Sequence, residues 1–353
     1  MTSPASTAFA VHVAATRAAA VRLAPVVTAL AERGVPQVVL DPAGACVAAT
    51  APGPPDTLAP AASTSALVLS LERLLAHAPP ALVLLAGDDD ATLACALVAS
   101  RAGAGIARLG GGLRCGDRTV RSEIARHALD ELAGLLLVDG EDAAEQLRSE
   151  GVDPDRVRCV GSTVPDTVGR WIASARAAST AESRGLREGA YVLATLHRPE
   201  GAAEDMRLAR AAESLSLLSR DRDIVLCPHP RAAALLELMG DIRRLRTAGV
   251  TVVGPLDYLG FLSLEAAAAA VVTDAATVQE ETTVLGVPCF TLARSSERAL
   301  TLTYGTNALA GEEPEDLAAL IATAEQPPAG GIPLWDGAAG ERAASALLEW
   351  KSR

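Results

Sequence analysis

The sequence of 353 residues predicts an α/β protein with two Rossmann-like domains, each a doubly wound parallel sheet covered by helices on both faces. Three observations lead to this fold class. The chain is about twice as long as a typical domain. Short runs that are apolar at almost every position alternate with longer helical stretches, and such runs are typical of parallel strands buried on both faces. The same alternation begins a second time near residue 191, which indicates two similar halves.

The first half begins with a strand at 10–14 and a helix at 18–33. That helix is expected to end at Gly34, because glycine commonly follows the last turn of a helix. Further strands are expected at 36–40, 81–86, 105–109, 134–138 and 157–160. The stretch 91–102 is expected to be helical, and the Pro/Gly-rich stretch 50–64 to be a loop.

A stretch without strand character, 171–188, is expected to form a helix and a linker between the halves. The second half then has strands at 191–195, 223–227, 250–253, 270–273 and 287–292. A Pro/Gly loop at 326–333 precedes a last helix at 337–350. We therefore predict an N-terminal domain of residues 1–168, with 337–353 packing back on it, and a nucleotide-binding C-terminal domain of residues 169–336.

Charge, cysteine spacing and the N-terminal stretch exclude several classes of protein. A formal net charge of −12 lacks the basic footprint of a nucleic-acid binder, so no nucleic-acid partner is expected. The six cysteines show no CxxC spacing, which favours free thiols in the reducing cytoplasm and no metal site. The first residues do not form a signal peptide, and no apolar run approaches the ~18 residues of a membrane span, so no membrane association is expected.

Polar or glycine-rich clusters follow three predicted strands of the first half. Arg17 and Arg22 lie at the start of the first helix, where an anion is favoured, although two solvated arginines are the alternative. Asp88 follows the strand 81–86 at the rim where doubly wound folds bind ligands, and helix capping by this aspartate or its neighbours is the alternative. Three glycines at 110–112 allow a ligand to approach the backbone closely, or simply form a tight turn.

The second half repeats this pattern. His197 and Arg198 follow a strand directly, and His197 is a candidate acid/base or phosphate donor, with a surface turn as the alternative. His229 lies between two prolines that favour extended backbone. Residues 274–281 open a helix whose free N–H groups are suited to bind a phosphate, and Glu281 could accept hydrogen bonds from a ribose diol. The alternative is that the first residue of this stretch caps the helix and that Glu281 is solvated. Because such clusters recur in both halves, we expect a ligand in a cleft between them.

Taken in order, these clusters resemble the non-hydrolysing UDP-N-acetylglucosamine 2-epimerase family, which has the two-domain fold of GT-B glycosyltransferases. The likeness runs from about Val11 to Gly311. The family's Glu-Ala-Gly-Leu-Arg-Thr-Gly-Asp is similar to residues 110–117, and its Thr-x-His-Arg-x-Glu to residues 195–200. Other stretches similar to family motifs are 15–25, 87–89, 161–166, 255–261, 274–281 and 296–298.

The resemblance implies an anti elimination of UDP to a glycal, followed by re-addition with inversion at C2, without a metal or other cofactor. It implies Asp88, Glu123 and His197 as proton carriers. The substrate-binding residues that it implies are Arg17, Arg22, Arg114, Arg198, His229, Phe261, Ala275, Ala276, Thr277, Glu281 and Arg298. The expected ligand is a nucleotide-diphosphate sugar, foremost a UDP-sugar, and the expected assembly is a homodimer.

The chain also departs from the family pattern. Gly110 stands where the family has a glutamate, Ser122 replaces the first of two further glutamates, and residues 275–277 replace Ser-Gly-Gly. Loss of one acid/base group commonly lowers a rate by roughly 10²–10⁴.

Three functions are therefore compared. The first is a divergent epimerase. The second is a GT-B-type transferase that keeps the diphosphate grip of Arg17, Arg22 and Arg298 and uses Asp88 or His197 as base. The third is a non-catalytic nucleotide-sugar-binding or partner protein. We favour the first because the likeness covers most of the chain.

Overall fold

The computed structural model describes residues 9–40, 46–48, 63–77, 80–197, 204–311, 317–323 and 331–351. The chain divides into two compact units, the first formed by Met1–Gly169 with Pro333–Arg353 and the second by Arg170–Ile332. The predicted loops at 50–64 and 326–333 fall largely outside the described residues.

The first unit contains a seven-stranded sheet in the order β3-β2-β1-β4-β5-β6-β7. Its strands are β1 (Ala10–Val13), β2 (Gln37–Leu40), β3 (Cys46–Ala48), β4 (Leu82–Ala86), β5 (Gly105–Leu109), β6 (Leu135–Val138) and β7 (Val157–Cys159). Every neighbouring pair is parallel except β2 and β3, which are antiparallel. The short edge strand β3 was not predicted, whereas the six other strands were, and their parallel pairing confirms the α/β class.

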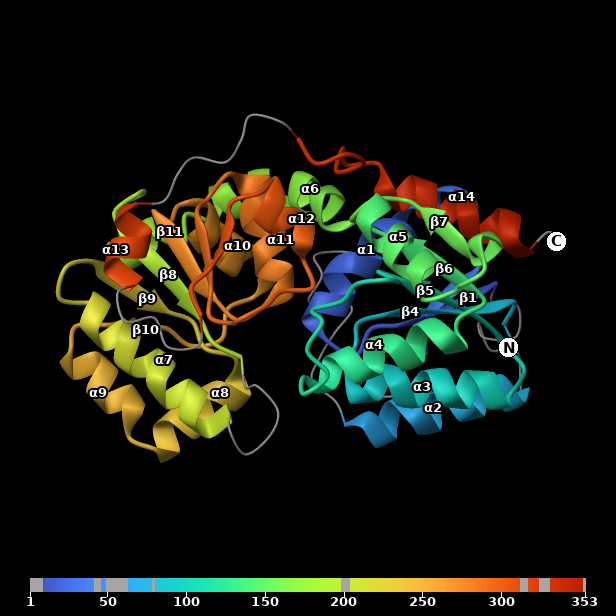
Figure 1. Ribbon diagram of the computed structural model, residues 1–353, viewed down its shortest axis with the longest axis horizontal. Helices are drawn as coiled ribbons and strands as arrows, with labels where there is room; N and C mark the ends of the chain where they lie inside the picture. Colours follow the sequence, from blue (N-terminus) through green and yellow to red (C-terminus); the bar gives the residue numbers. More distant parts are fainter. Residues whose placement is uncertain are drawn as a thin grey trace. The chain divides into compact units, whose positions relative to one another are not determined.

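Helices cover both faces of this sheet, as Figure 1 shows. They are α1 (Arg17–Glu32), α2 (Thr64–His77), α3 (Asp90–Arg101), α4 (Arg121–Leu132), α5 (Glu141–Ser149) and α14 (Ala339–Lys351), and α6 (Val164–Ala177) leads out of the unit. Successive strand residues serve opposite faces: Leu84 packs with α1 and α14, whereas Val83 packs with α2 to α5. Both faces are therefore apolar, which explains the uninterrupted apolar runs in the sequence.

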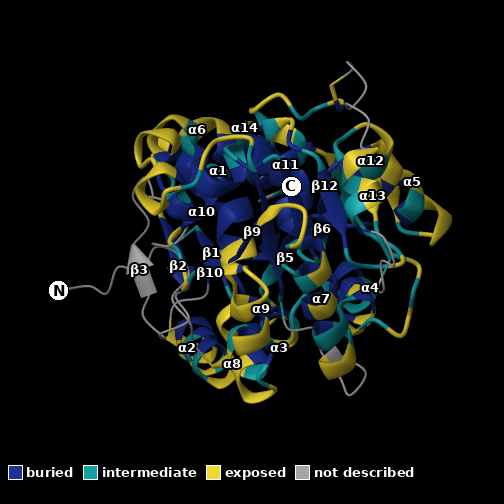
Figure 2. Cartoon of the chain, turned by 90° about the vertical axis from the view of Figure 1, so that its left-hand side faces the viewer, coloured by how far each residue is buried: buried dark blue, intermediate teal, exposed yellow. Residues whose placement is uncertain are grey.

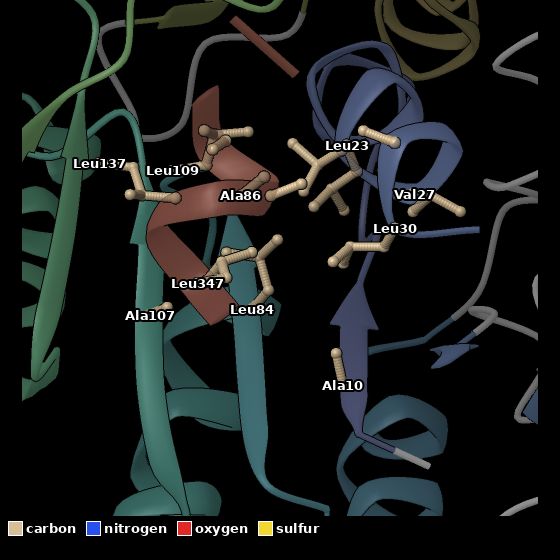
Figure 3. Packing of buried hydrophobic residues seen from close by; sticks show 14 of the residues in the cluster. Ala10, Leu23, Val27, Leu30, Leu84, Ala86, Ala107, Leu109, Leu137 and Leu347 are labelled. Atoms are coloured by element: carbon tan, nitrogen blue, oxygen red, sulfur yellow. The ribbon is translucent and has the colours of Figure 1, made fainter. Parts of the chain in front are cut away.

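Helix α14 completes the first unit although it lies at the far end of the chain. Leu347 packs beside Leu84 and Leu23 in the core (Figure 3). Gly340 allows α14 to lie close to α1, because a Cβ there would stand 2.7 Å from the Cβ of Pro25. Arg33 donates to Glu341 across the same two helices, at 2.6 Å.

The second unit contains a six-stranded, fully parallel sheet in the order β10-β9-β8-β11-β12-β13. Its strands are β8 (Tyr191–Thr195), β9 (Asp223–Leu226), β10 (Thr251–Val252), β11 (Ala270–Thr273), β12 (Cys289–Thr291) and β13 (Asn307–Leu309). Strand β13 was not predicted, because it is short and begins with the polar Asn307. That asparagine is buried and pairs with Thr291 and Gln279, which neighbour it only in the folded sheet.

The helices of the second unit also lie on both faces of its sheet. They are α7 (Glu204–Leu218), α8 (Pro230–Leu238), α9 (Asp241–Thr247), α10 (Tyr258–Ala266), α11 (Ala276–Leu285), α12 (Ala299–Thr303) and α13 (Leu317–Ala322). One face packs against α7, α8 and α9, and the other against α10 and α11. Figure 2 shows buried strands beneath helices that are exposed on their outer sides. Within the described ranges, none of the helices is long and apolar enough to cross a membrane.

Candidate functional site

Polar side chains gather at the carboxyl ends of the strands in each unit. In the first unit the central group is an ion-pair cluster around Arg126 on α4. Its guanidinium pairs through Nη1 with Asp88, which follows β4, and donates from Nε to Glu123 at 3.1 Å. The side chain of Asp88 is 37% exposed, whereas that of Glu123 is 2% exposed. The cluster therefore presents Asp88 to a ligand and keeps Glu123 inside.

Both oxygens of Glu123 accept hydrogen bonds from the glycine-rich loop. The backbone N–H groups of Cys115 and Gly116 each donate to this carboxylate at 3.0 Å. Burial opposes its charge, but these hydrogen bonds and Arg126 outweigh burial and lower the pKa of Glu123. Glu123 is thus ionised at neutral pH with its oxygens in use, and we now propose it as the residue that holds the loop in place.

A second carboxylate, Asp130 of α4, fixes the other end of the glycine-rich loop. It accepts from the Gly112 N–H at 3.1 Å and from Arg108 at 2.7 Å, and it lies 2.8 Å from Arg114. Arg114 also pairs with Glu150 at 2.8 Å, and its side chain is 7% exposed. The guanidinium that was assigned to substrate binding therefore turns into the protein, where it holds the loop.

Arg22 lies beside the position of the absent family glutamate. Its side chain is 4% exposed and pairs with Asp139, which follows β6. A Cβ on Gly110 would stand 2.8 Å from Arg22 Nη2, and Gly110 has a φ of +79° that disfavours any other residue. The guanidinium of Arg22 thus fills the space that a side chain at 110 would need. Arg17, at the start of α1, is exposed.

The close packing of Gly112 gives a direct test of this loop. A Cβ there would meet the carbonyl oxygen of Ala143 and stand 3.0 Å from Leu147 Cγ, at a φ of +76°. Gly112→Ala is expected to lower the free energy of unfolding by about 2–4 kcal/mol, the combined cost of a left-handed alanine and overpacking. Urea denaturation measures this loss. Gly151→Ala is the matched control, since its φ is +83° with open space around it; an equal loss in both variants would contradict the packing argument.

In the second unit, His197 follows β8 and is held by Asp274, which follows the neighbouring strand β11. The His197 backbone N–H donates to both oxygens of Asp274, at 2.8 and 3.0 Å. The ring Nδ1 lies 3.2 Å from Asp274 Oδ1, and the side chain is 44% exposed. This contact leaves the ring's Nε2 to face a ligand, which suits an acid/base or a phosphate donor. The alternative that Asp274 caps α11 is wrong, because Ala275 is the N-cap residue.

His229 lies next to His197, with the two ring centroids 5.3 Å apart and the planes tilted by 31°. It is the N-cap of α8, and its Nδ1 accepts from the Arg231 N–H at 3.3 Å. The two histidines come from the ends of adjacent strands, β8 and β9. They form a compact pair at the carboxyl edge of the second sheet.

The start of α11 lies after β11, at the same sheet edge. The Ala275 N–H donates to Thr273 at 2.9 Å, and no side chain caps the helix. Thr277 and Glu281 of α11 are buried, and Phe261 of α10 is buried in the core. Arg298 lies 3.3 Å from the buried Glu280. Arg198 lies outside the described residues.

A family model described as UDP-N-acetylglucosamine 2-epimerase matches residues 54–348. The chain belongs to the UDP-N-acetylglucosamine 2-epimerase family. The UDP-N-acetylglucosamine 2-epimerase of Methanococcus maripaludis is 32% identical over 263 residues, covering 72% of this chain and 71% of the relative. The UDP-2,3-diacetamido-2,3-dideoxy-D-glucuronate 2-epimerase of Pseudomonas aeruginosa is 30% identical over 251 residues, covering 70% and 68%.

The fold agrees with solved structures of the family. The crystal structure of Methanocaldococcus jannaschii UDP-GlcNAc 2-epimerase in complex with UDP-GlcNAc and UDP gives a TM-score of 0.85 at 26% identity, covering 96% of this chain and 99% of that chain. The resemblance stated from the motifs and the GT-B-like fold class are both confirmed.

Within this family member, the structure brings the predicted site residues together as two groups. Asp88 and Glu123 meet through Arg126, and His197 meets His229 beside Ala275. From their positions at strand ends we also expect His197 to face Asp88 of the other unit, and this stays a prediction. Arg126 and Asp139, which help to position this site, were not predicted from the sequence, and Asp274 was considered only as the first residue of 274–281 and as a helix cap. Asp139 directly follows a predicted strand, so the strand-end rule that singled out Asp88 was sufficient to find it.

Proposed function

We propose that this chain is an isomerase that acts on a UDP-sugar, as a divergent UDP-N-acetylglucosamine 2-epimerase. Family membership supports the reaction class, and the M. jannaschii relative was crystallised with UDP-GlcNAc and UDP. The observation that carries the proposal is the His197–Asp274 contact beside His229 and the start of α11. It combines an acid/base candidate with a helix N-terminus suited to phosphate at one sheet edge.

We assign the diphosphate to the backbone N–H groups at 275–277, together with Arg17, Arg198 and Arg298. Glu281 is proposed to accept from the ribose hydroxyls. Arg22 is the other arginine that we assign to the diphosphate. Its ion pair with Asp139 holds the guanidinium in place, so Arg22 contributes its positive charge from within that pair. Phe261 is proposed to shape the base end from within the core.

Asp88 and His197 are proposed to move the protons. One takes the proton from C2 of the sugar as the bond from C1 to the UDP oxygen breaks, which gives a glycal and UDP. Re-addition of UDP at C1 and of a proton at the opposite face of C2 then inverts this centre. The partial exposure of the Asp88 carboxylate and of the His197 imidazole supports this assignment.

A transferase remains the second candidate, because the guanidinium of Arg22 occupies the space that the family's glutamate at position 110 would need. A transferase needs the diphosphate grip and one base but not the second carboxylate. We also propose a cytoplasmic location, which is supported by the free thiols of Cys95, Cys115, Cys159, Cys227 and Cys289. A homodimer remains the expected assembly, and light scattering of the protein in solution would measure its mass.

Incubation with UDP-N-acetylglucosamine in heavy water tests the reaction. Deuterium is expected at C2 of the sugar, together with the C2 epimer, because the proton at this carbon exchanges during elimination and re-addition. Nuclear magnetic resonance and mass spectrometry measure both. UDP binding without deuterium uptake, with sugar passed to an added acceptor, would support the transferase instead, and no binding of either ligand would overturn both proposals.

A further inference from the structure

Helix α10 carries a buried acid that neither the fold nor the proposed reaction requires. Glu265 is completely buried, and neither of its carboxyl oxygens has a hydrogen-bond partner among the described residues. A buried carboxyl without such a partner is costly, commonly by about 1–3 kcal/mol or more. Met or Leu would fill a core position on α10 without this cost, so Glu265 calls for an explanation.

The charged neighbour of Glu265 is another carboxyl, Glu281 of α11. Glu281 is 3% exposed, and the two side chains repel each other between adjacent helices. Two carboxylates this close in an interior cannot both be charged at ordinary cost. One proton is therefore held by the pair.

Among the residues that the structure describes, the other titratable groups around Glu265 supply no positive charge. Cys289 of β12 faces it, and burial raises the pKa of this thiol to about 12, so the thiol stays neutral. Tyr191 of β8 donates its hydroxyl to the Leu264 carbonyl at 2.5 Å and is likewise neutral. Burial, followed by the repulsion from Glu281, raises the pKa of Glu265 well above its ordinary range, so Glu265 is a member of this pair that holds a proton.

We propose that Glu265 is a positioning residue of the nucleotide site, which holds the proton of the Glu265–Glu281 pair and thereby fixes the single negative charge on the second turn of α11. This inference rests on the proposed function, in which α11 holds the diphosphate at its start and Glu281 meets the ribose. Loss of the proton places two like charges between α10 and α11. These charges push the two helices apart and add negative potential where an anionic ligand binds.

The affinity for UDP therefore depends on pH through Glu265. Isothermal titration calorimetry with UDP from about pH 7 to about pH 9.5 stays above the second phosphate ionisation near 6. The uracil N3–H of UDP ionises toward the upper end of this range, and this change is common to every variant, so a difference between variants reports on the protein. The dissociation constant of UDP for the natural chain is expected to rise by about tenfold or more over this range. A tenfold change corresponds to a difference of about one unit between the pKa of Glu265 in the free and in the UDP-bound chain. Glu265→Gln mimics the protonated acid and is expected to remove this rise.

Glu213→Gln, at an exposed position on α7, is the matched control and is expected to keep the rise. Glu265→Met provides a second neutral variant of similar length, so the result does not depend on the folding of one variant. Parallel pH profiles for the natural chain and both neutral variants would overturn the inference while leaving UDP binding intact. Absence of UDP binding at every pH would instead overturn the proposed function, and this inference with it.

Thermal unfolding gives an independent readout of the proton. The folded chain binds more protons than the unfolded chain between the ordinary and the raised pKa, so its stability falls as pH rises through that window. The melting temperature of Glu265→Gln should therefore exceed that of the natural chain by a margin that grows from about pH 4.5 upward. A margin that does not change with pH would show that Glu265 holds no proton.

Discussion

Replacement of His197 by alanine is expected to lower turnover by roughly 10²–10⁴, the usual contribution of a general acid or base. The imidazole is oriented by Asp274 through Nδ1 and is half exposed at the sheet edge, so it is placed to exchange a proton with a ligand. Ground-state binding should change much less, because phosphate contacts at α11 do not depend on this ring. Steady-state kinetics and calorimetry with UDP separate the two effects.

His77→Ala is the matched control for this experiment. His77 is exposed at the end of α2 and bonds to the Arg73 carbonyl of its own helix. It should leave turnover unchanged. Turnover of the natural substrate that survives in His197→Ala would remove His197 from the proton-transfer step and leave Asp88 as the remaining candidate.

Replacement of Asp130 by alanine is expected to lower the free energy of unfolding by about 3–5 kcal/mol, the usual cost of breaking a buried ion pair from one side. The loss leaves Arg108, whose side chain is 2% exposed, without its carboxylate partner. It also removes the acceptor for the Gly112 N–H and one partner of Arg114. Urea denaturation measures the stability, and UDP calorimetry reports whether the loosened loop affects the ligand site.

Asp221→Ala is the control, because Asp221 is exposed in the turn before β9. Surface substitutions of this kind usually stay within about 0.5 kcal/mol. A similarly small loss in Asp130→Ala would show that Arg108 finds another partner and that Asp130 does not hold the loop.

The amino-acid sequence by itself determined the strands of both sheets, with two exceptions. Its apolar runs mark strands buried on both faces, and Ala10–Val13 and Tyr191–Thr195 begin the two series. Position at strand ends also marked Asp88 and His197 as candidate site residues. The exceptions are β3 and β13, which are edge strands of three residues each.

Only the tertiary structure decided which side chains meet. His197 and Asp274 are 77 residues apart, and they meet because β8 and β11 are neighbours in the sheet. Arg22 and Asp139 are 117 residues apart, and they form a buried ion pair that neither of their motifs indicates. Glu265 was not singled out at all, since its burial against Glu281 depends on the packing of α10 on α11. The physical reason is the same in each case: local periodicity records which residues are buried, whereas the charge and partner of a buried group are set by strand order and helix packing, which a periodic pattern does not encode.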